Sequence, residues 1–96
     1  MLKKRVEEIL NEQLNREFYS AYLYLSMSAY FDSTDLPGFA HHMKVQYQEE
    51  MAHAIRIFNY LSNVGGRVEL KAIAQPKNVW NGIIEVFEET HKHECF

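Results

Sequence analysis

The sequence predicts an all-α protein with two long antiparallel helices, a long crossover loop and a truncated third helix. Apolar residues recur at three- and four-residue steps along residues 3–32, which contain neither glycine nor proline. The same spacing returns over residues 36–64 and again over about residues 83–96. Residues 65–82 show no helical period, so we expect a loop that crosses the length of a bundle.

The segment that joins the two long helices has the composition of a tight turn. Thr34 and Asp35 are candidate N-caps for the second helix, and Pro37 suits a first helical turn, where its missing N–H costs nothing. Gly65 and Gly66 suit the end of that helix, because glycine readily adopts the left-handed conformation. A turn this short makes the two long helices antiparallel neighbours.

Length and charge exclude several classes of protein. The chain has 96 residues, of which 47% are apolar, and a formal net charge of −3. A chain this short buries a modest core, so we expect a homo-oligomer. It has no basic field for nucleic acid, and its most apolar stretch, residues 21–31, is shorter than the ~20 residues that span a bilayer. A single cysteine, Cys95, and no visible signal peptide predict a cytoplasmic protein.

Ionisable residues interrupt the apolar faces of both long helices. Glu50 and His53 are three residues apart, so they are neighbours on one helix face. Glu17 likewise places an ionisable side chain within the apolar face of the first helix. A carboxylate within an apolar stripe is costly unless it is paired or bound to a metal.

Helix geometry predicts that these three residues meet. Glu17 lies about 17 residues before the centre of the turn, and Glu50 and His53 lie about 16 and 19 residues after it. Residues equally far from the turn face each other in an antiparallel pair. Carboxylate oxygen and imidazole nitrogen suit iron or manganese, and zinc or copper less selectively. The Glu-x-x-His spacing alone also fits a surface glutamate beside a solvated histidine, but Glu17 at the facing level favours a metal site.

The third helix offers further candidates. Glu94 continues the apolar face of Ile83 and Phe87, and we prefer it as a ligand. Glu88-x-x-His91 also has the ligand spacing, but Glu88 lies off that face.

Other polar residues are assigned by their positions. Tyr24 lies two turns after Glu17 on roughly the same face, so its hydroxyl could reach a ligand or a redox intermediate. Glu49 points about 100° away from Glu50 around the helix. Three roles fit this position: a residue that contacts the ligands from outside, a transient binding site for iron, or a solvated surface residue. We expect the remaining histidines at the solvated surface and Cys95 to be inert; these histidines are His41, His42, His91 and His93.

At these residues the chain closely resembles bacterial non-haem ferritin. The resemblance lies in residues 11–17 (NEQLNRE), 22–24 (YLY) and 48–54 (QEEMAHA). Residues 65–70 (GGRVEL) look like the long loop of that family, and His93-Glu94 resembles its third-helix ligand region. The resemblance covers the whole chain, as a partial ferritin-like domain over residues 1–96.

The resemblance implies a ferritin-like four-helix bundle and an iron-storage function. A di-iron ferroxidase centre would oxidise Fe(II) with O2 or H2O2, and ferric mineral would be stored in a shell of 24 subunits if the family assembly holds. By position, Glu17 and Glu94 resemble terminal ligands, Glu50 the bridging carboxylate and His53 the single imidazole. Tyr24 resembles the tyrosine beside the centre, and Glu49 a ligand of an accessory iron site.

The chain also departs from that family. Haem-binding relatives carry methionine where this chain has Ala52, so we expect no haem. The chain covers about the first half of a family member, without the fourth helix that carries further ligands. Either it is a fragment, or two copies form a symmetric dimer, in which each hairpin supplies Glu17 and Glu50-x-x-His53. Encapsulated ferritin-like proteins, which are two-helix chains, resemble the second solution.

Two other functions remain open on the sequence alone. The chain could be a structural or assembly module with an incomplete metal site. It could also be a different di-iron protein, such as a rubrerythrin-like peroxidase, although those usually carry a cysteine-rich domain and this chain has one cysteine.

Overall fold

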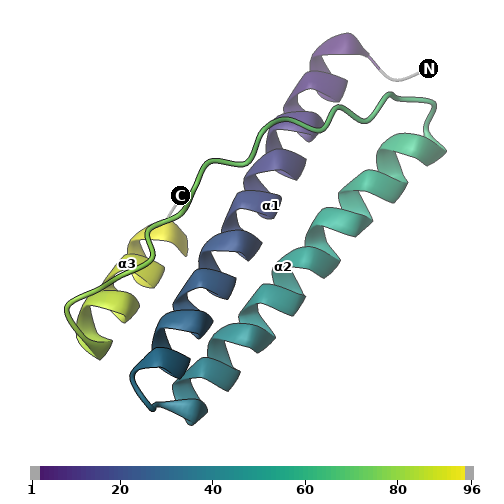
Figure 1. Ribbon diagram of the computed structural model, residues 1–96. Coiled ribbons are helices and arrows are strands. Elements are labelled where there is room, and N and C mark those ends of the chain that lie inside the picture. The colour runs from purple at the N-terminus through teal and green to yellow at the C-terminus, as the bar shows by residue number, and fades with distance from the viewer. Residues whose placement is uncertain (1–2, 95–96) are drawn as a thin grey trace.

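The computed structural model describes residues 3–94, with only the backbone of Glu94, and confirms the all-α prediction. Over these residues the regular elements are three helices: α1 (Lys4–Ser33), α2 (Pro37–Asn63) and α3 (Ile83–Glu94). Helices α1 and α2 lie side by side and antiparallel, and α3 lies beside the turn-end half of α1 (Figure 1). The molecule measures 50 × 21 × 19 Å, because α1 alone spans about 45 Å at 1.5 Å per residue.

The turn between α1 and α2 is closed by a residue in the left-handed conformation. Asp35 has a φ of 57°, and the Leu36 amide donates to the Phe31 carbonyl at 2.9 Å. This six-residue closure is a common way to end a helix. The expectation that Thr34 or Asp35 caps α2 is wrong, since Leu36 is the N-cap residue and no side chain caps the helix. Asp35 instead terminates α1 through its left-handed backbone conformation.

Two clusters of buried side chains hold the helices together. The larger one lies toward the turn and includes residues of all three helices: Leu23, Tyr24, Met27, Phe31, Ala40, Met43, Trp80 and Val86. The smaller one lies toward the far end of α1 and α2: Leu14, Ala54 and Leu61. Glu17 on α1 and Glu50 on α2 fall between the two clusters in sequence, so the polar site interrupts a continuous apolar interface.

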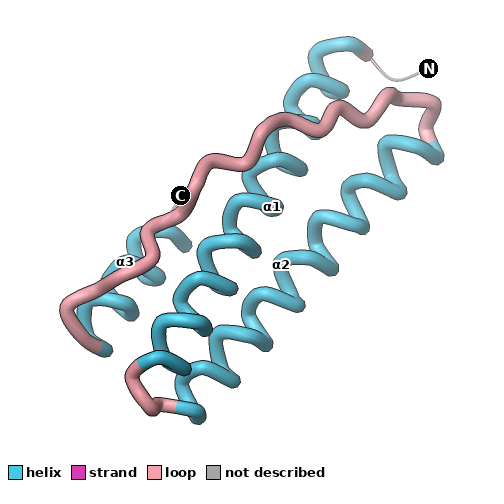
Figure 2. The backbone as a smooth tube through the Cα atoms, in the orientation of Figure 1, coloured by secondary structure: helices cyan, strands magenta, loops and turns pink. Residues whose placement is uncertain are grey.

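The crossover loop runs back along α1 in an extended conformation (Figure 2). Asn11 donates to the Arg67 carbonyl at 2.9 Å and accepts from the Glu69 amide at 2.8 Å. Asn15 repeats the pattern with the Glu69 carbonyl and the Lys71 amide, at 2.9 and 2.8 Å. The four-residue step from Asn11 to Asn15 advances about 6 Å along the helix, and two extended residues advance about 6.6 Å. The two asparagines therefore match alternate loop residues and hold the loop against α1.

Helix α3 is attached to α1 through the residues that precede it. The Ser26 hydroxyl donates to the Lys77 carbonyl at 2.6 Å, and the Trp80 ring meets the Tyr30 ring edge-on at 5.4 Å. Lys77 Nζ also donates to Glu85 Oε1 at 2.9 Å. This hydrogen bond raises the pKa of Lys77 and lowers the pKa of Glu85, so the pair stays charged at neutral pH.

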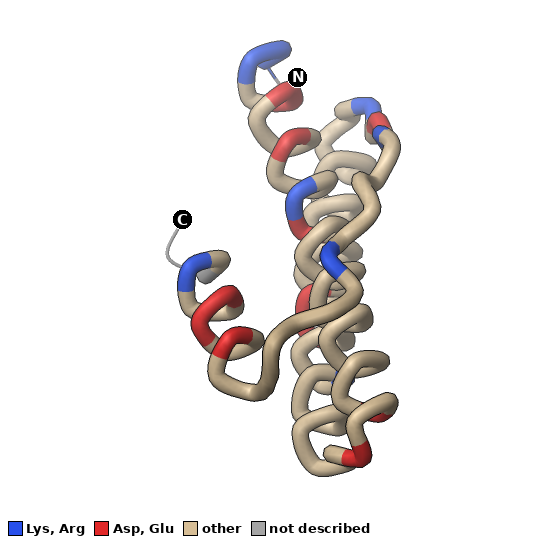
Figure 3. Tube along the Cα trace, turned by 60° about the vertical axis from the view of Figure 1, so that its left-hand side comes forward, with Lys and Arg blue, Asp and Glu red and all other residues tan. Residues whose placement is uncertain are grey.

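Charged residues of both signs follow one another along α1, and acidic residues predominate on α3 (Figure 3). Within the described part of the chain, none of the helices combines the length and apolar character needed to cross a membrane.

Candidate metal centre

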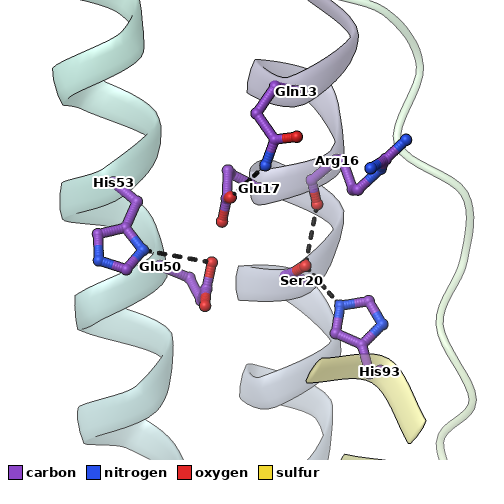
Figure 4. Close-up of polar contacts among 7 residues, drawn as sticks. All are labelled: Gln13, Arg16, Glu17, Ser20, Glu50, His53 and His93. Atoms are coloured by element: carbon purple, nitrogen blue, oxygen red, sulfur yellow. Dashed lines mark hydrogen bonds and ion pairs between the residues drawn. The ribbon is translucent and has the colours of Figure 1, made fainter. Parts of the chain in front are cut away.

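Glu17, Glu50 and His53 come together across the interface of α1 and α2. One ligand atom from each of the three side chains lies within 4.8 Å of the other two. Figure 4 shows the Glu17 carboxylate on α1 pointing toward Glu50 and His53 on α2. The meeting follows from the antiparallel pairing of the two helices, which brings residues equally far from the turn to one level.

The two α2 residues share one helix face. His53 Nδ1 lies 3.8 Å from Glu50 Oε2, as expected for residues three apart on a helix. Oε2 of Glu50 is buried, and the Glu50 side chain is 20% exposed, whereas that of His53 is 48% exposed. The carboxylate therefore lies at the inner end of the site, and the imidazole lies at its mouth.

The three residues line a pocket of about 330 Å³. Its other lining residues are Gln13, Arg16, Ser20 and His93. The Gln13 amide donates to Glu17 Oε1 at 2.6 Å, whereas the Arg16 guanidinium points away from both carboxylates (Figure 4). The half-exposed His53 side chain makes the pocket accessible from solvent, and the pocket contains two acidic groups at close range.

This arrangement suits a divalent cation. Two carboxylates within 4.8 Å repel each other, and a cation between them attracts both and so offsets that repulsion. At metal–ligand distances of about 2.1 Å, the ligand atoms of one ion lie roughly 3–4 Å apart. His53 Nδ1 and Glu50 Oε2, 3.8 Å apart, already lie within this range, and all three ligand atoms lie within 4.8 Å of one another. The oxygen and nitrogen donors fit iron or manganese chemistry.

The other predicted site residues lie outside this cluster of three. Tyr24 is fully buried on α1, and its ring meets that of His93, which lines the pocket, edge-on at 6.3 Å. Glu49 is exposed on α2. The Glu94 side chain and Cys95 lie outside the described residues.

His93 differs from its predicted solvated position. It is partly buried, and its Nε2 lies 2.5 Å from the Ser20 hydroxyl. The same hydroxyl donates to the Arg16 carbonyl at 3.0 Å, so Ser20 links the α1 backbone to the His93 ring. His93 lies seven residues after the fully buried Val86, and that spacing, two helical turns, indicates the inward face of α3. The remaining histidines, His41, His42 and His91, are exposed as expected.

Fold and site together define a helical-bundle protein with a carboxylate–histidine site between two antiparallel helices. The Ferritin-like domain family matches residues 7–96, so the chain belongs to the ferritin family. This confirms the resemblance seen in the sequence.

Individual relatives agree with this assignment. The chain is 40% identical to bacterial non-heme ferritins of Campylobacter jejuni and Bacteroides fragilis, over 96 and 94 residues. These alignments cover 100% and 98% of this chain, and 58% and 59% of the relatives. The open pore ferritin of the archaeon Archaeoglobus fulgidus superposes with a TM-score of 0.97 at 46% identity, covering 99% of this chain and 59% of the other. The chain thus spans less than two thirds of the length of these proteins.

Proposed function

We propose that this chain serves iron storage, by binding Fe(II) at Glu17, Glu50 and His53 and supporting its oxidation to Fe(III). The observation that carries the proposal is the convergence of these three side chains in one pocket between α1 and α2. Membership of the ferritin family supports iron as the metal. The non-heme relatives, together with Ala52, support a centre without haem.

The proposed reaction is a two-iron oxidation. Two Fe(II) ions each lose one electron, and O2 takes up both electrons with two protons to give H2O2. With H2O2 as the oxidant, the two electrons and two protons yield two water molecules. Anionic oxygen ligands favour the higher iron charge, so the carboxylates of Glu17 and Glu50 would stabilise the product ion more than the substrate ion. His53 would supply the nitrogen ligand.

Further residues receive proposed roles from the family resemblance. Glu50 would bridge the two irons, with Glu17 and Glu94 as terminal ligands. Tyr24 would act beside the centre, and Glu49 would hold an accessory iron. The described residues contribute three clustered candidate ligands, so a complete two-iron set would draw on Glu94 and on a second copy or additional sequence.

We also propose that the chain acts as a cytoplasmic homo-oligomer, as part of a shell of 24 subunits or as a symmetric dimer. The open pore and closed forms described for the Archaeoglobus fulgidus ferritin support a shell. Light scattering distinguishes the assemblies: a discrete dimer or a large shell supports this proposal, whereas a monomer favours a structural module.

Ferrous iron added in air tests the proposed activity. The wild-type chain is expected to oxidise Fe(II) faster than buffer alone, as followed by ferric absorbance. Glu50→Ala and His53→Ala are each expected to slow the reaction by at least about tenfold, since even residues behind a metal ligand typically contribute that much. Matched controls are Glu12→Ala and His41→Ala, an exposed glutamate and an exposed histidine outside the pocket. Equal rates for all five proteins would rule out an oxidation centre at this site.

A further inference from the structure

Gln13 lies one helical turn before Glu17 and faces the same pocket. Its side-chain amide donates to Glu17 Oε1 at 2.6 Å. A hydrogen bond to an ionised carboxylate is stronger than one between two neutral groups. Both side chains are partly buried, so the contact lies at the wall of the pocket rather than in open solvent.

The contact gives the two carboxylate oxygens of Glu17 different partners. Gln13 approaches Glu17 from the side away from Glu50 and His53, so one oxygen faces the amide and the other faces the cluster (Figure 4). A carboxylate held in this way presents one oxygen to a cation and is already in the binding rotamer when the cation arrives. Ordering a free glutamate side chain on binding otherwise costs conformational entropy.

The chemical character of Gln13 suits this task. A glutamine donates a hydrogen bond without carrying charge, so it orients the carboxylate without neutralising it. A lysine or arginine in the same place would form an ion pair with Glu17 and would compete with the cation. The nearby arginine, Arg16, points its guanidinium away from the carboxylate (Figure 4).

We propose that Gln13 is a positioning residue, which holds Glu17 in a one-oxygen binding orientation toward Glu50 and His53. This inference rests on the proposed metal-binding function. Gln13 would contact a metal ligand rather than the metal itself, and residues in such positions typically contribute 10–100-fold in metal affinity.

Cobalt binding to the full chain tests the inference. Co²⁺ alone is titrated into metal-free protein, and its visible absorbance reports occupancy and ligand geometry. Gln13→Met keeps the side-chain length but removes the donor, and its dissociation constant for Co²⁺ is expected to rise about 10–100-fold. The matched control is Gln48→Met, at an exposed position on α2, which is expected to bind as wild type. The melting temperature of the metal-free Gln13→Met protein is expected to stay close to that of Gln48→Met.

A double-mutant cycle separates positioning from a general structural effect. If Gln13 acts through Glu17, Gln13→Met is expected to cost little in a Glu17→Ala background. An undiminished cost in that background would overturn the inference. Wild-type affinity in Gln13→Met, with loss of affinity in Glu17→Ala, would also overturn it and would leave the metal site standing. A wild-type chain that binds no Co²⁺ would overturn the inference together with the proposed function.

Discussion

Replacing Trp80 with alanine is expected to lower the free energy of unfolding by about 3–5 kcal/mol, the usual cost of truncating a buried aromatic side chain. Trp80 is 3% exposed and belongs to the larger cluster. Its indole N–H is buried without a hydrogen-bond partner among the described residues, so its contribution comes from apolar contact. Small domains are stable by only about 5–15 kcal/mol, and the loss is therefore a large share of the total.

The loss should be concentrated at α3, because Trp80 lies three residues before the start of that helix and packs on Tyr30. Chemical denaturation followed by circular dichroism measures the overall change, and amide exchange locates it. Val79→Ala is the matched control, since Val79 is the neighbouring residue and is 69% exposed. Equal stability of the two variants would contradict the role assigned to Trp80. Loosening of α3 would also remove the contact of His93 with Ser20 and so open one wall of the pocket.

Replacing Glu17 with glutamine is expected to weaken Fe(II) binding by about 100-fold. Binding energies of about 10–16 kcal/mol at four-ligand zinc sites correspond to roughly 3 kcal/mol per ligand, which is about 100-fold in affinity. The metal-free protein should not lose stability. It could gain up to about 1 kcal/mol, because one of two carboxylates within 4.8 Å becomes neutral.

Anaerobic titration calorimetry with Fe(II) measures the affinity of this variant, and thermal unfolding of the metal-free protein measures its stability. Glu12→Gln provides the control, since Glu12 is an exposed glutamate on α1. If both variants bind Fe(II) equally well, Glu17 is not a ligand. If Glu17→Gln loses both affinity and stability, the glutamate has a structural role instead.

The helices and the cluster of three could be anticipated from the sequence because both depend on periodicity. A 3.6-residue period places Glu50 and His53 on one face, and a short turn between long helices determines which α1 residue meets them. Glu17 is thus placed by counting from the turn. The ferritin resemblance then assigned roles that spacing alone could not assign.

The contacts that the sequence does not predict depend on the path of the loop and on side-chain partners. The asparagine contacts to the loop require an extended chain beside α1, and no period marks residues 65–82. Gln13 and Glu17 are four residues apart, a spacing that many pairs of residues in a helix share, so the spacing alone does not predict their contact. The charged neighbours of His93 in the sequence predict a surface position, but its two-turn spacing from the buried Val86 places it on the inward face of α3.

The position of bound iron tests the proposed metal centre most directly. Crystals of the chain are soaked anaerobically with Fe(II), and anomalous difference density is measured at the iron absorption edge. A peak is expected between the Glu17 carboxylate, the Glu50 carboxylate and the His53 imidazole. Iron bound elsewhere, with this pocket empty at saturating Fe(II), would contradict it.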